Sequence, residues 1–548
     1  MFFRVKKSKQ YSYLQIVESY RDEGAVKQHV LMTVGRLDLL QQEGKLDALM
    51  RSGLRLCENI DVIDAHAKGN TKPVSVLRIG PDLVFARLWK ETGLASILRS
   101  LLQERSFGFE LERAVYLTVL HRLFCPGSDR AAEKWKESYR IDGVESLQLH
   151  QLYRTMGWLG EPLGDEKDFF GHPRSIKDQI EEALFDQRRD LFSQIDLVFF
   201  DTTSIYFEGE GGQSIGQHGY SKDHRPDLKQ MVVGLALDAE GNPICCHLWP
   251  GNTSDATTLI PVVKDMQTRF GVQRVCIVSD RGMVSQKTTE ALRSEEIDCD
   301  YILGVRMRRV KDVYENVLKS KKPYVEIQPE RRCSKDPSPL KVKEVMSAGK
   351  RYIVCLNEEQ RRKDAADRET ILAALSEKLK QGAKSLVGNK GYRKYLKGDT
   401  SSQFTIDEAK VKSESKYDGI WVLETNTDME TEVVAQAYKQ LWMVEDMFRS
   451  MKSILETRPI YHKCDDTIRG HVFCSFLALV LRQELERRLE AKGLQYEWKE
   501  IIRGLENLHE VEAEFQGQTY FLRSKLVGDA RQACQAAGVA IPPTMTKR

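Results

Sequence analysis

The chain has 548 residues, with 83 Lys and Arg against 80 Asp and Glu, so its formal net charge is only +3. This length exceeds what one hydrophobic core usually supports and predicts about three or four domains. The nearly balanced charge excludes a uniformly basic surface, so any contact with nucleic acid has to come from local patches. The 11 cysteines include no Cys-x-x-Cys pair, which excludes a zinc ribbon and favours a reducing compartment.

No part of the sequence indicates export or membrane insertion. The segment Met1–Lys7 is charged too early for a secretory signal. The longest apolar run, Val472–Leu481, is too short to span a bilayer. We therefore expect a soluble protein of the cytoplasm.

The first 190 residues predict a β-rich segment followed by a helical one. Residues 1–60 contain alternating apolar and polar side chains, and Gly24 supplies the turn of a hairpin. Residues 61–190 change to apolar positions three and four residues apart, which is typical of amphipathic helices. We therefore expect two domains in this part of the chain.

Two helices of the second segment allow two interpretations. A helix at Leu111–Leu123 is followed by a break at Pro126–Asp129 and by a basic helix at Arg130–Ser138. Such a pair is either a DNA-reading motif or an ordinary helical hairpin. The sequence leaves both open.

A strand predicted at Ile195–Phe207 carries a carboxylate, Asp201, in its middle. The first half of this strand shows no polar alternation, so we expect it to be buried on both faces. Burying an unpaired carboxylate is costly, and Asp201 therefore needs a cation, a cage of hydrogen bonds or a metal ion. The alternative is an Asp at a strand end that accepts backbone N–H groups.

Alternating strands and helices follow between Gln230 and Val305. The predicted strands are Gln230–Asp238, Pro243–Trp249, Arg274–Asp280 and Asp300–Val305, and the predicted helices are Thr257–Phe270 and Gln286–Ser294. Three strands in hairpin succession, then helix, strand, helix and strand, predict an α/β fold with a ribonuclease-H-like mixed sheet. In such a sheet the strand of Asp201 lies beside the strand that ends at Asp280, and ligands collect at the carboxyl ends of strands.

Residues 306–424 break this pattern and predict a β-rich insertion. We expect a strand pair at Lys341–Cys355, a solvated helix at Glu358–Lys380 and strand character at Lys410–Thr425. The insertion also contains a run of basic residues. Such a run is either a solvated surface or a binding site for DNA phosphates, and both interpretations stay open. The basic residues at its start include Arg306, Arg308, Arg309, Lys321 and Lys322.

A long helix is expected at Glu432–Ile454. At 100° per residue, seven steps return to within about 20° of the starting direction, so Tyr438, Glu445 and Lys452 stand in one line. A carboxylate on this packing face needs a cation, although a surface Glu with a Lys seven residues later is the alternative. Residues 491–548 predict a helical C-terminal region.

With these residues assembled, the chain resembles the DDE transposases of bacterial cut-and-paste insertion sequences. The resemblance lies with the branch whose third acid sits in a Tyr-x2-Arg-x3-Glu-x6-Lys signature, matched by Tyr438, Glu445 and Lys452. Leu441 stands where the signature has Arg, and Arg449, one turn past the Glu, could supply that DNA contact instead.

The other two acids of the family match Asp201 within Phe-Phe-Asp-Thr-Thr and Asp280 within Val-Ser-Asp-Arg-Gly. The resemblance implies that these residues and Glu445 are catalytic and hold two Mg²⁺ or Mn²⁺ ions, with Asp201 as the bridging ligand. Two such ions about 4 Å apart clamp the attacking and leaving oxygens of a phosphodiester. An all-oxygen site is also the ligand set expected for these ions rather than for zinc.

The resemblance further implies a catalytic domain in two parts, 191–305 and 425–490. The implied partners are terminal inverted repeats and target DNA, bound by a synaptic homodimer near the bacterial nucleoid. We place base reading in residues 1–190, with the helical segment Leu111–Ser138 of the DNA-binding domain 61–190 as the expected reader, and sequence-independent phosphate binding in the insertion. The residues expected to contact DNA are Tyr438, Arg449, Lys452, Lys222, Arg225 and Arg281.

Two other functions remain alternatives. One is a metal-dependent nuclease that hydrolyses DNA without joining it. The other is a domesticated DNA-binding protein with an idle site, against which the three intact acids speak. Inverted repeats flanking the reading frame would favour a mobile element.

Overall fold

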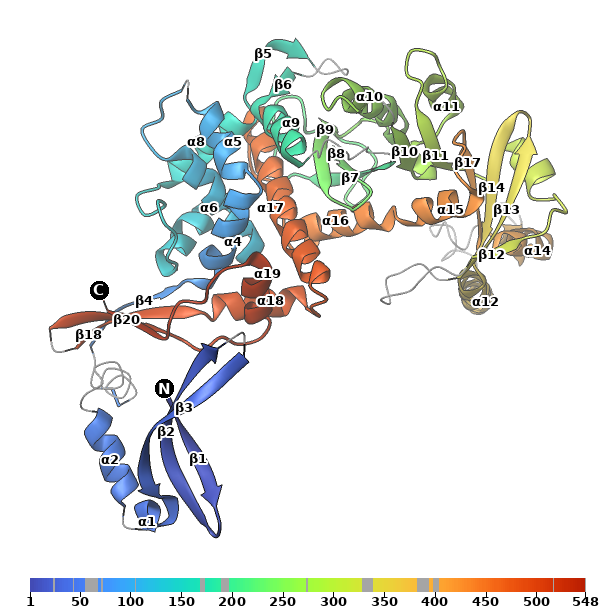
Figure 1. Ribbon diagram of the computed structural model, residues 1–548. Helices are drawn as coiled ribbons and strands as arrows, with labels where there is room; N and C mark the ends of the chain where they lie inside the picture. Colours follow the sequence, from blue (N-terminus) through green and yellow to red (C-terminus); the bar gives the residue numbers. More distant parts are fainter. Residues whose placement is uncertain are drawn as a thin grey trace. The chain divides into compact units, whose positions relative to one another are not determined.

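Two compact units make up the structure, a computed structural model (Figure 1). One unit combines Met1–Gly80 with Glu497–Arg531 and Ala540–Arg548, and the other combines Pro81–Tyr496 with Gln532–Val539. The structure describes residues 1–22, 25–42, 44–54, 68–69, 72–103, 105–167, 173–188, 197–272, 275–327, 339–381, 394–397, 404–515 and 517–547.

The first unit begins with a three-stranded antiparallel sheet. Strand β2 (Tyr11–Asp22) pairs with β1 (Phe2–Ser8) and with β3 (Ala25–Arg36), which confirms the predicted hairpin. The turn residue expected between β2 and β3, Gly24, lies outside the described residues. The prediction of a β-rich segment is wrong for residues 37–42 and 45–54, where the helix-forming residue Leu is the most frequent. These two segments form α1 (Leu37–Gln42) and α2 (Lys45–Leu54).

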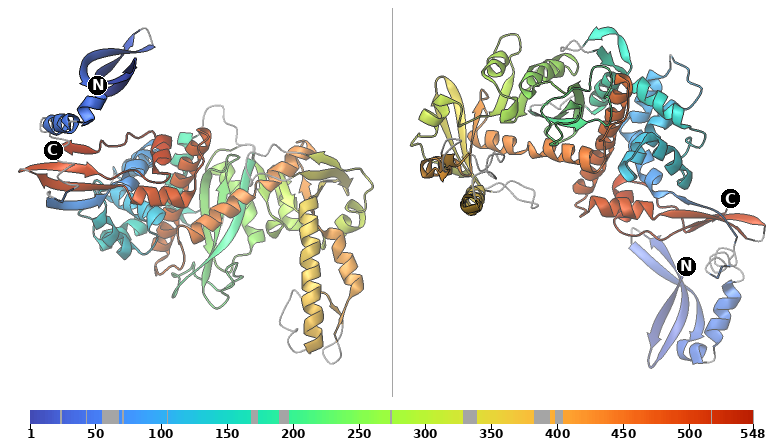
Figure 2. Two further views of the ribbon diagram at one scale, coloured as in Figure 1. Left: turned by 90° about the horizontal axis from the view of Figure 1, so that it is seen from below. Right: turned by 180° about the vertical axis from the view of Figure 1, so that it is seen from behind.

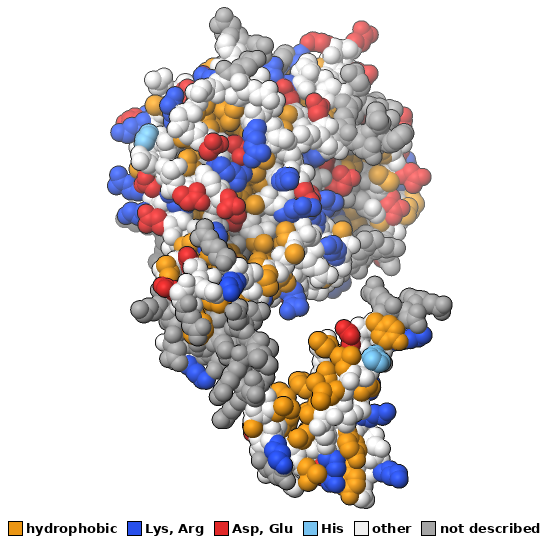
Figure 3. All heavy atoms as spheres, turned by 60° about the vertical axis from the view of Figure 1, so that its left-hand side comes forward, with side chains coloured by type: hydrophobic (Ala, Val, Ile, Leu, Met, Phe, Trp, Pro, Cys, Tyr) orange, Lys and Arg blue, Asp and Glu red, His pale blue; other side chains and the backbone are white. Residues whose placement is uncertain are grey.

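This small sheet has little core of its own. Leu14 and Val17 are its buried apolar residues among those described. Many other apolar side chains are exposed, and they gather over the N-terminal sheet at the bottom of Figure 3. They include Phe2, Phe3, Val5, Val26 and Met32.

A second sheet of the first unit corrects our prediction for residues 491–548. We expected a helical region, but the chain forms three strands there that pair with a strand from the N-terminal part. Along β18, acidic and apolar residues alternate with a period of two, which specifies a strand rather than a helix. The helices of this region are α18 (Trp498–Glu506) and α19 (Ala530–Ala537). In spatial order the strands are β20 (Met545–Lys547), β19 (Gln518–Arg523), β18 (His509–Phe515) and β4 (Lys72–Arg78).

The helical segment predicted at 61–190 is confirmed from residue 80 onward. Helix α6 packs against α8 and against α17 (Asp465–Ala491), and nearly all of its residues are buried. Burial excludes α6 itself as a reading helix, but α7 exposes Arg130 and Lys134, so both interpretations of this helix pair stay open. Between them, the Ser128 side chain accepts a hydrogen bond from the N–H of Ala131 at 3.2 Å, as expected of an N-cap. The helices are α4 (Gly80–Glu91), α5 (Leu94–Leu101), α6 (Leu111–Phe124), α7 (Asp129–Trp135), α8 (Leu149–Leu159) and α9 (Ile176–Arg188).

A mixed sheet of nine described strands dominates the second unit. Helices α10 (Asp255–Thr268) and α11 (Gln286–Leu292) connect its strands at the predicted places. A buried cluster beneath the sheet includes Phe200, Trp249 and Ile277. In spatial order the strands are β12 (Val325–Ile327), β13 (Leu340–Ser347), β14 (Lys350–Leu356), β17 (Ile420–Thr425), β11 (Asp300–Gly304), β10 (Cys276–Ser279), β7 (Leu197–Tyr206), β8 (Gln230–Leu237) and β9 (Pro243–Pro250).

The insertion is not a separate sheet. The predicted strand pair forms β13 and β14, but β14 joins β17 and thereby extends the same sheet. The predicted solvated helix is α12 (Glu358–Gln381), which runs away from the end of the sheet in the left view of Figure 2. Strand character at Lys410–Thr425 is confirmed only for β17, because residues before it form α14 (Glu408–Glu414). The short strands β15 (Leu396–Lys397) and β16 (Thr405–Ile406) pair with each other.

The helix expected at Glu432–Ile454 is interrupted. It consists of α15 (Thr431–Lys439) and α16 (Trp442–Ser453), separated at Gln440 and Leu441. Both junction residues keep right-handed helical dihedral angles, and Tyr438 and Glu445 border one cavity across the junction. Within the described part of the chain, no helix combines the length and apolar character required to cross a membrane.

Candidate active site

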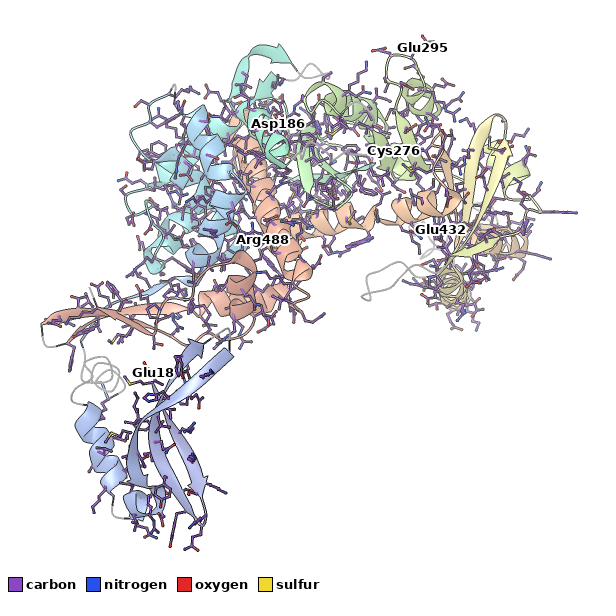
Figure 4. The ribbon with its side chains drawn as sticks, in the orientation of Figure 1. Glu18, Asp186, Cys276, Glu295, Glu432 and Arg488 are labelled. Carbon is purple, nitrogen blue, oxygen red and sulfur yellow. The ribbon has the colours of Figure 1, made fainter. Side chains whose placement is uncertain are left out.

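Asp201 and Asp280 lie next to each other because their strands are neighbours. Strands β7 and β10 pair in parallel with Phe200 opposite Ser279, and the two acids are the next residue on each strand. Figure 4 labels Cys276, the first residue of β10, inside the sheet. The predicted pairing of these two strands is confirmed.

Loss of hydration in its partly buried position raises the pKa of Asp201 to about 6. The Lys222 ammonium and the N–H of Thr202, which donates to Oδ1 at 2.7 Å, act in the opposite direction. The carboxylates of Asp280 and Asp255 add to the rise. Asp201 thus has both a nearby cation and a backbone hydrogen bond, the two non-metal partners considered from the sequence.

Glu445 comes from a distant part of the chain and reaches the same place. It lies exposed in the first turn of α16 and lines a cavity of about 350 Å³ together with Asp201 and Asp280. The same three acids border a second cavity of about 230 Å³ beside Tyr438 and Trp442. The structure therefore brings together the three acids proposed from the sequence. We call the first cavity the acid cavity.

The acid cavity suits a hard divalent ion in its chemistry. Its lining offers carboxylate and hydroxyl oxygens and contains neither Cys nor His. Across the described residues, no three His, Cys, Asp or Glu side chains lie close enough to form a ready-made metal cage. The residues thus fit Mg²⁺ or Mn²⁺ by donor type, while the acids share the cavity without forming a closed ligand set.

Tyr438 is half-buried and contacts one of the acids. Its hydroxyl donates a hydrogen bond to Oδ1 of Asp280 at 2.9 Å. Burial and this carboxylate raise the pKa of Tyr438, so the hydroxyl keeps its proton. The contact requires Gly304 on β11, since a Cβ there would lie 2.4 Å from the Tyr438 hydroxyl oxygen. The sequence predicted a phosphate contact for Tyr438, but the structure places it as a support for Asp280.

Lys452 is also occupied within the protein. Its ammonium lies 2.8 Å from Oδ1 of Asp223, which Arg458 approaches to 2.9 Å. Burial lowers the pKa of Lys452, although the hydrogen bond to Asp223 acts against this. Lys452 is only 12% exposed, so its main contact is this ion pair.

Lys222 and Asp255 form a network that supports the acid cavity. The Lys222 ammonium lies 2.7 Å from the carbonyl oxygen of Thr202, 2.9 Å from its hydroxyl and 3.1 Å from Oδ2 of Asp255. The Thr202 hydroxyl in turn donates to Oδ1 of Asp255 at 2.8 Å. The sequence analysis gave Asp255 no role.

The three other predicted DNA contacts differ in availability. Arg225 pairs with Asp227 at 2.8 Å and Arg449 with Asp446 at 2.8 Å. Arg281 is exposed, follows Asp280 directly and makes no ion pair or hydrogen bond through its side chain with any residue described. Among these three, Arg281 is best placed to meet a phosphate.

A second residue missed in the sequence, Arg306, supports the loop after Asp280. Its guanidinium donates to the carbonyl oxygens of Arg281 and Gly282, each at 3.0 Å. Arg306 was counted only as part of a basic run, and its position beside this loop follows from the pairing of β10 with β11.

Two family models match the chain. Residues 192–481 match the transposase DDE domain, and residues 3–65 match the N-terminal domain of the IS1634 family transposase. The first match spans more than half of the sequence, and the chain therefore belongs to the transposase DDE domain family. It is a DDE transposase of the insertion-sequence type, an enzyme of DNA cleavage and strand transfer.

Comparisons with individual proteins add less. No curated protein sequence matches the chain. A cryo-EM structure of the piggyBac transposase synaptic complex with hairpin DNA is 12% identical, covers 78% of each chain and has a TM-score of 0.36. The Mos1 transposase paired-end complex with left transposon end is 14% identical, covers 36% of this chain and 60% of the other, and has a TM-score of 0.14. Likeness at these scores carries no further argument.

Proposed function

We propose that this transposase binds the terminal inverted repeats of its own element, cleaves phosphodiester bonds there and joins the freed 3′-hydroxyl ends to target DNA. One observation carries the proposal: Asp201, Asp280 and Glu445, from three distant segments, line one cavity. The spacing of Tyr438 and Lys452 around Glu445 supports the Tyr-Arg-Glu-Lys branch of the family.

Asp201, Asp280 and Glu445 would hold Mg²⁺ or Mn²⁺. Bound there, the ions would activate the attacking oxygen and relieve charge on the scissile phosphate. The Tyr438 hydroxyl restrains Asp280 through Oδ1 and leaves Oδ2 available. Lys222 keeps a fixed positive charge beside Asp201.

DNA contacts would come from local patches, since the net charge is only +3. Arg281 and the exposed arginines at the start of the insertion would hold phosphates without regard to sequence. We place base reading in residues 1–190, where α7 exposes Arg130 and Lys134 and where residues 3–65 match the transposase N-terminal domain. Two copies bound to two ends would form the synaptic homodimer.

Alanine variants at the three acids test the proposal. Asp201→Ala, Asp280→Ala and Glu445→Ala should each abolish cleavage of labelled end DNA in Mg²⁺ and leave its binding in Ca²⁺ nearly unchanged. Asp446→Ala, which alters the neighbouring acid on α16, is the matched control and should cleave normally. A variant of the three acids that retains more than a few per cent of cleavage would show that its residue holds no metal.

The products separate transposition from plain hydrolysis. Wild-type protein given pre-cut ends and a plasmid should covalently join them through the 3′-hydroxyl. Ends that are cut but never joined, in Mg²⁺ and in Mn²⁺, would instead favour the metal-dependent nuclease.

A further inference from the structure

A larger cavity opens beside the acid cavity. It has a volume of about 620 Å³, and Asp280 and Gly282 line both cavities. Its lining contains four arginines but one carboxylate, Asp280, so it is strongly positive. We call it the arginine pocket; its polar walls are Tyr220, Arg281, Arg306, Arg308 and Arg309.

The arginines of this pocket divide into fixed and available groups. Arg306 holds two backbone carbonyl oxygens, and Arg308 pairs with Glu414 at 3.1 Å and stacks over Tyr417. The exposed side chains of Arg281 and Arg309 make no hydrogen bond or ion pair with the residues that the structure describes. Two guanidinium groups are therefore free to bind phosphates, held on a wall that the other two stabilise.

Tyr220 adds an aromatic ring to this positive wall. It lies in the loop between β7 and β8, and 85% of it is exposed. A single exposed ring is ordinary on a protein surface, but this one lines the same cavity as four arginines. Aromatic rings beside basic side chains are the usual means of holding single-stranded nucleic acid, because unpaired bases stack on the ring while phosphates meet the cations. The bases of a duplex are already stacked on each other and cannot reach such a ring.

We propose that the arginine pocket binds an unpaired segment of DNA strand next to the scissile phosphate. One nucleobase stacks on Tyr220, and the flanking phosphates pair with Arg281 and Arg309. The shared wall at Asp280 and Gly282 lets a strand continue from the acid cavity into the pocket. The volume lies within the range of about 300–1,000 Å³ that bound small molecules occupy, which suits a nucleotide. This inference rests on the proposed function, because it needs the scissile phosphate in the acid cavity.

Fluorescence anisotropy tests the pocket without cleavage. Full-length protein in EDTA is titrated with a labelled single-stranded oligonucleotide, with the same oligonucleotide made abasic at every position, and with the matching duplex. Tyr220→Ala should weaken binding of the intact single strand about 10-fold or more, the scale of one lost base stack, and change the abasic strand and the duplex less than twofold. Tyr220→Phe should bind like the wild type. Tyr461→Ala, at a tyrosine 65% exposed elsewhere, is the matched control and should change nothing.

Arg309→Gln tests the phosphate contact separately. It should weaken intact and abasic strands alike and lower the salt slope by about 0.7, whereas Arg362→Gln on α12 should not. If Tyr220→Ala lost affinity for the single strand and the duplex equally, or lost no affinity at all, the proposed binding of an unpaired strand would be contradicted. Failure of the proposed function would look different: the wild-type protein would not cleave end DNA in Mg²⁺ even though Tyr220 governs binding of single strands.

Discussion

The acid cavity and the arginine pocket share a wall but are built in opposite ways. In the acid cavity, Asp280 accepts from Tyr438, and Lys222 contacts both Thr202 and Asp255. In the arginine pocket, Arg281 and Arg309 make no such contacts through their side chains within the described chain, although Arg306 and Arg308 do. The difference indicates that contacts within the protein hold the side chains of the acid cavity in place for catalysis. The arginine pocket instead offers unpaired positive charge to a negatively charged ligand. This view predicts unequal effects for neighbouring substitutions.

The adjacent residues Asp280 and Arg281 should separate the two sites most clearly. Asp280→Asn should lower kcat by at least about 100-fold, the scale for one charged group lost at a reacting centre. Arg281→Gln should raise KM and leave kcat within a fewfold, because it removes binding common to the ground state and the transition state. Single-turnover cleavage at several DNA concentrations measures both. Equal loss of kcat in the two variants would contradict the division.

Asp201→Asn should inactivate the enzyme and stabilise it. An acid with a higher pKa in the fold than in the unfolded chain takes up protons on folding, so stability falls as pH rises from about 4 to about 6. Above pH 6 the full penalty is present, and a shift of this size corresponds to up to about 3 kcal/mol. In EDTA at pH 8 the variant should therefore melt at a higher temperature than the wild type, and the gain should disappear near pH 4. A lower melting temperature at pH 8 would contradict the origin of the shift.

Gly304→Ala should show how much the Tyr438–Asp280 contact contributes. The added Cβ would meet the Tyr438 hydroxyl, so Asp280 would lose its support and cleavage should fall about 10- to 100-fold, as when a group behind a metal ligand is lost. Tyr438→Phe removes the same hydrogen bond and should cause a similar loss. In the double variant the losses should not add, because both act on one contact. Additive losses would mean that Gly304 acts elsewhere.

The smallest effect is expected at Lys452. Lys452→Met should destabilise the fold by about 1 kcal/mol, because Asp223 loses one of two cations and retains Arg458. Arg449→Met, on the same helix but 67% exposed, is the matched control and should change stability little. Urea denaturation measures both. If the two variants unfold alike and Lys452→Met instead loses DNA affinity, Lys452 contacts phosphate as the sequence suggested.

The sheet could be predicted because its strands carry their own signal. The first half of β7 and most of β8 and β10 are apolar without polar alternation, which is typical of strands buried on both faces. Asp201 interrupts such a run, which made it visible without any neighbour. The C-terminal strands were missed because the whole region was assigned one helical character. The alternation of acidic and apolar residues in β18 was the signal that could have revealed them.

The supports of the site could not be predicted because they depend on tertiary placement. Tyr438 and Glu445 are seven residues apart, which in one continuous helix places them in line. That spacing alone does not show that the Tyr438 hydroxyl donates to Asp280, because the contact depends on how α15 packs beside β10 and β11. In the sequence, Arg306 is one member of a basic run. The pairing of β10 with β11 places its guanidinium where it donates to the backbone carbonyl oxygen of Arg281, in the loop after Asp280.

Metal rescue of Asp280→Cys tests the central claim most directly, because it ties one side chain to one ion. A thiolate is a soft ligand that binds Mg²⁺ poorly and Mn²⁺ better. Cleavage of end DNA by Asp280→Cys should therefore be absent in Mg²⁺ and should return in part in Mn²⁺, while Asp446→Cys should cleave normally in both. Full activity of Asp280→Cys in Mg²⁺, or no recovery at any Mn²⁺ concentration that supports the wild type, would contradict the assignment of Asp280 as a metal ligand.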